Sequence, residues 1–178
     1  MRWNKFNQNY FDNIDNKAKA FWLGFIFGNC SIEKRPTLTM TILKKNETII
    51  KELSSVLDSS SNIRISKGCY TFGLCSNHFC NKIKEYGRID KNNITFPKIS
   101  KDFYYAFIAG FVKGNSSMFL TKNNKTLDIH GPLSFLQEIK SVLDIGGSTS
   151  GPTTYRHGCR LRYSGPNQIT KLKKLGIL

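Results

Sequence analysis

Apolar residues recur along the first half of the chain with two different periods, and each period predicts an element. Over 16–27 and 46–57 they recur every three or four positions, as on a helix with one buried side, and Asp15 is the expected N-cap. Over 37–42 they alternate with threonines, as on a strand with one buried face. A hairpin and a short helix follow. In order, the predicted helices and strands cover residues 16–27, 37–42, 46–57, 63–66, 70–75 and 77–86.

Each half is expected to follow the order helix, two strands, helix, two strands, helix. In the first half only one strand of the first pair, 37–42, is placed, whereas the second half places both. Its helices and strands are expected over residues 101–112, 118–121, 126–129, 132–143, 153–155, 160–163 and 166–175. This pattern divides the chain into a first unit over 1–90, a linker over 91–100 that contains Pro97, and a second unit over 101–178.

A sequence repeat supports this division. The stretch AFWLGFIFGNCS in the first half has its counterpart in AFIAGFVKGNSS in the second. Gly24 and Gly110 lie 86 positions apart (110 − 24), and Gly28 and Gly114 are separated by the same number (114 − 28). The tetrapeptide Ser-Val-Leu-Asp recurs at this offset too. Agreement at several points under one offset indicates a duplicated unit.

The repeated glycines predict how the two units meet. Gly24 and Gly28 are four positions apart in one helix, as are Gly110 and Gly114 in the other, so each pair lies on one face. Because a glycine has no side chain, another backbone can approach this face closely. We therefore expect the two helices to pack through their glycine faces, about an internal pseudo-twofold axis.

The charge of the chain indicates the class of its partner. There are 27 Lys and Arg against 12 Asp and Glu, which gives a formal net charge of +15. Such an excess opposes compactness by self-repulsion and is typical of proteins that bind a polyanion, nucleic acid first of all. The sequence contains no evident Lys/Arg-rich amphipathic helix that would bind a membrane surface. The apolar run over 20–28 is shorter than the ~20 residues that a membrane-spanning helix needs. Charge alone is also compatible with a basic, merely soluble protein.

The cysteines predict a reducing environment. Their number, five, is odd, and their spacing shows no pairs. Cys75, His78 and Cys80 are close in sequence, but there is no C-x-x-C and no evident fourth ligand, so no metal site is expected. Without an apolar leader segment, the protein is expected in the cytoplasm, associated with DNA.

The two repeated stretches resemble the motif of the LAGLIDADG homing endonucleases, in their single-chain form with two motifs. The matching residues are WLGFIFGNC over 22–30 and IAGFVKGNS over 108–116, and the resemblance covers nearly the whole chain. It implies an α+β fold of two pseudo-symmetric αββαββα units, each with a curved antiparallel sheet, packed through the motif helices. It also implies a saddle of sheets over the DNA major groove, with one acidic residue per motif that binds Mg²⁺.

The chain departs from this resemblance at the acidic positions, which fall on Asn29 and Asn115. A carboxylate brings negative charge to a divalent cation, whereas an amide brings a neutral oxygen, and Mg²⁺ sites of this kind depend on carboxylates. The glycine that follows in the family is Cys30 in one motif and Ser116 in the other, and Lys113 stands where the family often has an acid. These further changes favour natural loss of cutting over an engineered Asp-to-Asn substitution that traps a complex.

If the sheets form a saddle, the polar faces of the strands would contact DNA. Arginine suits a bidentate contact with guanine, and lysines near turns suit phosphates. Arg160 and Arg162 alternate with apolar residues and so emerge on one side. The expected DNA-contacting residues are Lys34, Arg35, Thr37, Thr39, Thr41, Arg64, Ser66, Lys67, Lys122, Lys125, Thr126, Arg156, Arg160 and Arg162.

The sequence therefore predicts a sequence-specific binder of double-stranded DNA that acts as a monomer on a long, non-palindromic site without cutting it. A repressor or regulator from a phage or mobile element fits this description. No cofactor is expected. The first alternative is a LAGLIDADG homing endonuclease, active or trapped, which would need Mg²⁺. The second alternative is an RNA-binding intron maturase.

Overall fold

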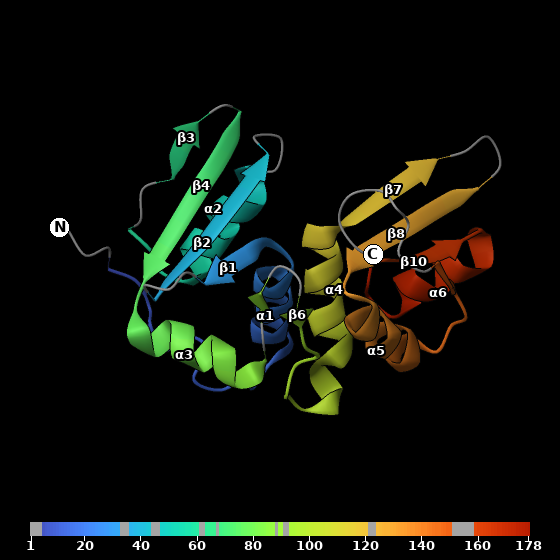
Figure 1. Cartoon of the computed structure of the whole chain (residues 1–178), viewed down its shortest axis with the longest axis horizontal. Coiled ribbons are helices and arrows are strands. Elements are labelled where there is room, and N and C mark those ends of the chain that lie inside the picture. Colours follow the sequence, from blue (N-terminus) through green and yellow to red (C-terminus); the bar gives the residue numbers. More distant parts are fainter. Residues whose placement is uncertain are drawn as a thin grey trace.

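Figure 1 shows the computed structural model of the protein, with two helices side by side at its centre and a sheet on either side of them. It describes residues 5–32, 36–43, 47–60, 63–66, 68–87, 89–90, 93–120, 124–150 and 159–178, and of Ser66, Asp90, Thr149 and Ser150 it describes the backbone. These residues form six α-helices, two four-stranded antiparallel sheets and a two-stranded ribbon, so the predicted α+β class is confirmed.

In the first half, a helix leads directly into an antiparallel sheet. The elements of this half are α1 (Lys17–Asn29), β1 (Cys30–Ile32), β2 (Thr37–Leu43), α2 (Glu47–Val56), β3 (Arg64–Ser66), β4 (Cys69–Cys75) and α3 (Asn77–Tyr86). The strand order is β1-β2-β4-β3, so β2 and β4 form the centre of the sheet. Their ladder runs from Thr37 opposite Cys75 to Leu43 opposite Cys69. The predicted hairpin of β3 and β4 is confirmed, with Gly68 at φ 76° in its turn.

The second half repeats this order of elements. A short 3-10 turn, η2 (Lys101–Phe103), precedes its first helix. The remaining elements are α4 (Tyr104–Asn115), β7 (Ser116–Leu120), β8 (Lys125–Gly131), α5 (Leu133–Leu143), β9 (Ser148–Ser150), β10 (Cys159–Ser164) and α6 (Pro166–Lys174). The strand order β7-β8-β10-β9 is the counterpart of that in the first sheet. The strand predicted over 153–155 lies outside the described residues, and the edge strand beside β10 is β9.

The sheets bury the faces that their alternation predicts. On β2, Leu38 and Met40 are buried, and on β8 the buried apolar residues are Leu127 and Ile129. Helix α1 differs, because it is buried continuously over 22–27 and apolar on all sides, as expected of a helix that lies between two halves. No helix in the described part of the chain is long and apolar enough to cross a membrane.

One apolar core runs through both halves. The rings of Phe27 in α1 and Phe107 in α4 meet with their centroids 5.3 Å apart, and Phe111 packs on Phe135 of α5 at 4.7 Å. Phe96 comes from the segment between the halves and packs on Phe107 at 5.8 Å. The same segment forms the ribbon of β5 (Ile89–Asp90) and β6 (Asn93–Ile94). It is therefore part of the core as well as a connection.

The first helix differs from the expectation at both ends. Its N-cap is Asn16 and not Asp15, because Oδ1 of Asn16 accepts a hydrogen bond from the backbone N–H of Lys19 at 2.9 Å. Asp15 instead pairs with Nζ of Lys19 at 2.9 Å. Helix α1 also continues to Asn29, past the predicted end at residue 27, and α4 likewise continues to Asn115. Both motifs are thus helical to their last polar residue.

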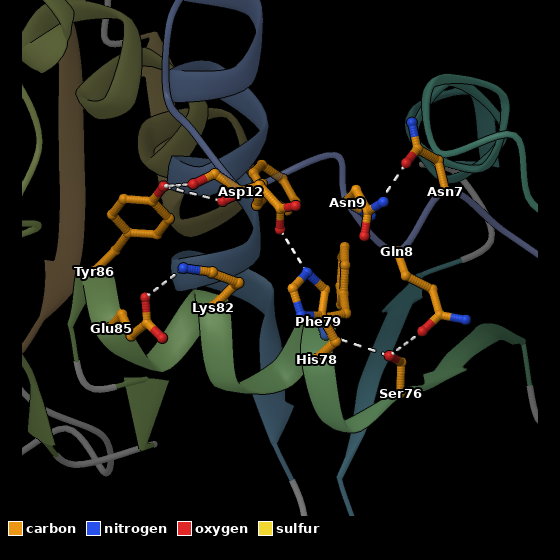
Figure 2. A network of polar contacts seen from close by, with 11 residues as sticks. Asn7, Gln8, Asn9, Asp12, Ser76, His78, Phe79, Lys82, Glu85 and Tyr86 are labelled. Carbon is orange, nitrogen blue, oxygen red and sulfur yellow. Dashed lines mark hydrogen bonds and ion pairs between the residues drawn. The ribbon is translucent and has the colours of Figure 1, made fainter.

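The N-terminal arm, residues 5–16, packs along α3 (Figure 2) and was not predicted. Phe11 of the arm is fully buried. Oδ1 of Asp12 lies 2.6 Å from Nε2 of His78, and the hydroxyl of Tyr86 donates to the carbonyl oxygen of Phe11 at 3.0 Å. These contacts fasten the arm to the last helix of the first half.

Candidate functional site

The motif helices α1 and α4 pack with their backbones in contact. A Cβ atom on Gly24 would overlap the carbonyl oxygen of Phe107, and one on Gly110 would overlap that of Phe21. The two overlaps are reciprocal, so each helix places its backbone where the other has no side chain. The structure therefore brings the two predicted glycine faces against each other.

Asn29 and Asn115 lie at the same end of this helix pair. Each is the last residue of its helix, α1 or α4. A Cβ atom on Gly114 would overlap the amide of Asn29, and one on Gly28 would lie 3.3 Å from the Cβ of Asn115. Each asparagine thus lies beside the second glycine of the other motif. The structure brings both residues together at the point where the helices run into their first strands.

The amides of both asparagines donate to backbone carbonyl oxygens. Nδ2 of Asn29 donates to Phe25 at 2.9 Å, and Nδ2 of Asn115 donates to His130 at 2.7 Å. Both side chains are half-buried. An ionised aspartate has no N–H to donate, so its oxygen in the place of Nδ2 would face a carbonyl oxygen. The local hydrogen bonding therefore favours an amide at both positions.

We call the side of each sheet opposite its buried apolar residues the open face. The open face of the first sheet is neutral apart from Arg64, as far as its residues are described. Thr41 and Thr71 stand opposite each other, with their hydroxyl oxygens 3.4 Å apart. The register places on this face Ser31, Thr37, Thr39, Thr41, Leu43, Arg64, Cys69, Thr71, Gly73 and Cys75.

The open face of the second sheet is charged, and at its centre is Asp128, only 2% exposed. Arg162 donates to this carboxylate from Nε and from Nη2, both at 2.7 Å, and Nη1 of Arg160 lies 3.6 Å away. The hydrogen bonds from Arg162 lower the pKa of Asp128 and raise the pKa of the guanidinium. The register places on this face Ser117, Phe119, Thr126, Asp128, His130, Ser148, Arg160, Arg162 and Ser164.

Some of the expected DNA-contacting residues have another place. Neighbours along a strand point to opposite sides, so Lys125 and Thr126 cannot share a face. Lys125 stands two positions before the buried Leu127 and opposite the exposed Leu120, so it lies on the side of β8 away from Thr126. Of Ser66, the structure describes a backbone pairing with Cys69. Outside the described residues lie Lys34, Arg35, Lys67, Lys122 and Arg156.

Similar solved structures include three protein–DNA complexes. I-SmaMI bound to uncleaved DNA in the presence of calcium ions has a TM-score of 0.63 and 11% identity, over 92% of this chain and 85% of that chain. I-WcaI bound to its DNA recognition sequence has a TM-score of 0.62 and 16% identity, over 94% of this chain and 85% of that chain. The LAGLIDADG homing endonuclease I-GzeII in complex with its DNA target has a TM-score of 0.58 and 13% identity, over 89% of this chain and 80% of that chain. No protein-family model and no curated protein sequence matches the chain. The chain has the fold of the LAGLIDADG homing endonucleases.

The resemblance of the motifs places the acidic positions of the LAGLIDADG fold on Asn29 and Asn115. Mg²⁺ prefers carboxylate oxygens, whereas these amides turn their Nδ2 atoms to backbone carbonyls. Within the part of the chain that the structure describes, no three or more His, Cys, Asp or Glu side chains gather to hold a metal ion. The residues at this end of the helix pair do not fit a divalent cation.

Sequence reasoning missed Asp128, the one buried carboxylate among the described residues of this LAGLIDADG fold. Its burial depends on the pairing of β8 with β10, which sets Asp128 directly opposite Arg162. The two positions are 34 residues apart, and alternation along a single strand does not reveal cross-strand partners. The available signal was an acid within an apolar strand, since such an acid needs a partner.

Proposed function

We propose that the protein binds double-stranded DNA across the open faces of its two sheets and does not cut it. The formal net charge of +15 supports a polyanionic partner. I-SmaMI, I-WcaI and I-GzeII, which share the fold, were each solved in complex with DNA. The open faces carry hydroxyl groups and arginines, the groups that meet base edges and phosphates in protein–DNA complexes.

The observation that carries the second half of the proposal is the hydrogen bonding of Asn29 and Asn115. Their amides donate to the carbonyl oxygens of Phe25 and His130, at the positions where the resemblance implies metal-binding carboxylates. Two neutral amides in this arrangement offer no negative charge to a divalent cation. Phosphodiester cleavage requires such charge stabilisation, and the two neutral amides do not supply it.

We further propose a single chain that occupies a long, non-palindromic site and acts as a repressor or regulator. The two halves present different chemistry on their open faces, and the two half-sites should therefore differ in sequence. A monomer with two linked halves needs no second copy to cover both half-sites. A bound protein that leaves its site intact acts by occupying it.

Selection of duplexes from a random library tests the proposal. The enriched duplex would be incubated with the protein and either Mg²⁺ or Mn²⁺, and the products separated on a denaturing gel. We expect a site of roughly 20 base pairs that is bound in a strongly salt-dependent way and stays intact. Cleavage by the unaltered protein would show that Asn29 and Asn115 support catalysis, and that the protein is an endonuclease.

Two companion measurements separate the remaining alternatives. The double variant Asn29→Asp/Asn115→Asp, incubated with the same duplex and metals, shows whether the acidic positions alone separate this chain from a nuclease. Competition between the selected duplex and structured RNA addresses the maturase alternative. Enrichment of no duplex, together with tight RNA binding, would overturn the assignment of DNA as the partner.

A further inference from the structure

Asp128 is an unexpected residue on a surface proposed to face DNA. A carboxylate there repels phosphates, and an acid that is only 2% exposed loses most of its hydration. Its burial comes from Arg160 and Arg162, which lie against it from the neighbouring strand β10. The negative charge of Asp128 weakens the attraction of this face for DNA of any sequence. A role for Asp128 should therefore lie in its contacts with the two arginines.

The hydrogen bonds leave one edge of Arg162 turned away from Asp128. A guanidinium carries five N–H groups, and this contact uses Nε–H and one N–H of Nη2, both at 2.7 Å. The opposite edge consists of Nη1 and the second N–H of Nη2. These groups form a planar fork of the shape that contacts two acceptors at once. The side chain of Arg162 is 35% exposed, whereas that of Asp128 is 3% exposed.

We propose that Asp128 is a positioning residue that holds Arg162 so that its outer edge reads a guanine. The two donors of that edge match O6 and N7 of guanine in the major groove. Because the carboxylate fixes the long side chain before binding, less conformational freedom is lost when the contact forms. Arg160 lies beside this pair, with its Nη1 at 3.6 Å from Asp128. The inference rests on the proposed binding of DNA through the open faces.

Charge provides a way to separate positioning from general attraction. Asp128→Asn removes one negative charge from the open face. If the arginines only attract phosphates, this variant binds every duplex as tightly as the unaltered protein or more tightly, with unchanged base preference. If Asp128 positions Arg162, the variant loses preference for guanine at one position, while its affinity for unrelated DNA stays equal or rises. The two roles thus predict different changes in the ratio of specific to non-specific affinity.

The experiment titrates the full-length protein and its variants with the selected duplex, with a random-sequence duplex, and with duplexes changed at single positions. The variants are Asp128→Asn, Arg162→Lys and the control Glu138→Gln, which removes an exposed acid of α5. A lysine keeps the charge of Arg162 but cannot form the bidentate fork. We expect Asp128→Asn and Arg162→Lys to lose about tenfold or more in preference for guanine at the same position, and Glu138→Gln to lose none.

Unchanged base preference in Asp128→Asn would overturn the inference, as would a loss at a position different from that of Arg162→Lys. If Asp128→Asn does not fold, Asp128→Glu replaces it. That variant keeps the charge but moves the carboxylate by one methylene, and we expect the same loss of preference for guanine. Enrichment of no duplex by the unaltered protein is a separate result, because it contradicts DNA binding itself.

Discussion

The open face of the first sheet carries hydroxyl, thiol and methyl groups and one arginine, Arg64, around the pair of Thr41 and Thr71. That of the second carries two arginines around the buried Asp128. The strand order behind the two faces is the same, β1-β2-β4-β3 and β7-β8-β10-β9. The two halves therefore share a strand order and differ in the side chains of their open faces. A sheet whose apolar side is covered by helices tolerates such change on its other side, because the fold does not depend on it.

The largest effect should come from breaking the helix pair that holds both faces in one molecule. In Gly110→Ala, the new Cβ overlaps the carbonyl oxygen of Phe21, and a backbone atom cannot move aside as a flexible side chain does. We expect a loss of about 3 kcal/mol or more in the free energy of unfolding, measured by urea denaturation. Both faces should lose DNA binding together.

The matched control for this variant is Gly73→Ala on β4. A Cβ atom there would lie 3.9 Å from the carbonyl oxygen of Leu38, an ordinary contact distance. Its stability should change by less than about 1 kcal/mol. If Gly110→Ala were as stable as this control, the close approach of α1 and α4 would be wrong.

Substitution of Asn29 or Asn115, which occupy equivalent positions in the two halves, should lower the stability by a smaller amount. Asn29→Asp and Asn115→Asp each replace a donor by an acceptor that faces a carbonyl oxygen. Each variant should lose about 1–3 kcal/mol in the free energy of unfolding at pH 7. Asn167→Asp, at an exposed position in the first turn of α6, is the control and should lose nothing, because a negative charge is favourable there. Equal stability of all three variants would contradict the hydrogen bonds of Asn29 and Asn115.

Acid should distinguish the two faces, because the described residues of the first open face include no carboxylate. The pKa of Asp128 is lowered from its ordinary value of 3.8 by the hydrogen bonds from Arg162. Its stabilising contribution is therefore fully present above pH 4 and is lost as the pH falls through the lower pKa of the folded protein. We expect the free energy of unfolding of the unaltered protein to exceed that of Asp128→Asn by about 1–2 kcal/mol at pH 7. The difference is modest because Arg162 is partly hydrated.

Urea denaturation of both proteins between pH 7 and pH 2 measures this difference. The advantage of the unaltered protein over Asp128→Asn should shrink below pH 4. A constant difference down to pH 2 would show that the carboxylate is not stabilised in the folded state.

The smallest expected effect is on the salt dependence of DNA binding, which compares one variant on each open face. Arg160→Gln should reduce the slope of log affinity against log salt by about one, whereas Thr41→Ala should leave the slope unchanged. Thr41→Ala should weaken binding of the selected duplex by less than about 1 kcal/mol, because one hydroxyl and one methyl are lost. Filter binding at several salt concentrations measures both. Equal slopes in the two variants would mean that the charged face does not contact phosphates.

Periodicity predicted the order of the elements and the positions of most of them, because helices and strands with one buried side leave a regular pattern. The repeat predicted the glycine contacts of α1 and α4, since glycines at the same spacing in two helices indicate that the backbones approach each other there. The N-cap was misplaced by one residue: Asp15 and Asn16 are both good caps, and only the hydrogen bond to Lys19 distinguishes them. Local pattern could not predict contacts between distant segments.

Two of these unpredicted contacts matter most for the molecule. The arm over residues 5–16 packs on α3 through contacts between residues 66 to 75 positions apart, such as Asp12 with His78 and Phe11 with Tyr86. Asp128 was missed for the same reason, because its partner lies on another strand. The chemistry of the site therefore depended on register, and the sequence pattern alone does not set register between strands that are far apart in the chain.

The burial of α1 on all sides has a consequence for the newly made chain. The first half is complete when Tyr86 has been synthesised, since α3 ends there, but α4 is complete only at Asn115. Translation of the 29 residues between them (115 − 86) takes roughly 1.5–6 seconds at about 5–20 residues per second. During that interval the apolar face of α1 that α4 will cover is exposed to water and to chaperones. The two halves thus differ in the order of their synthesis. The first half is made before the helix that covers it, whereas the second half is made after the surface on which it packs.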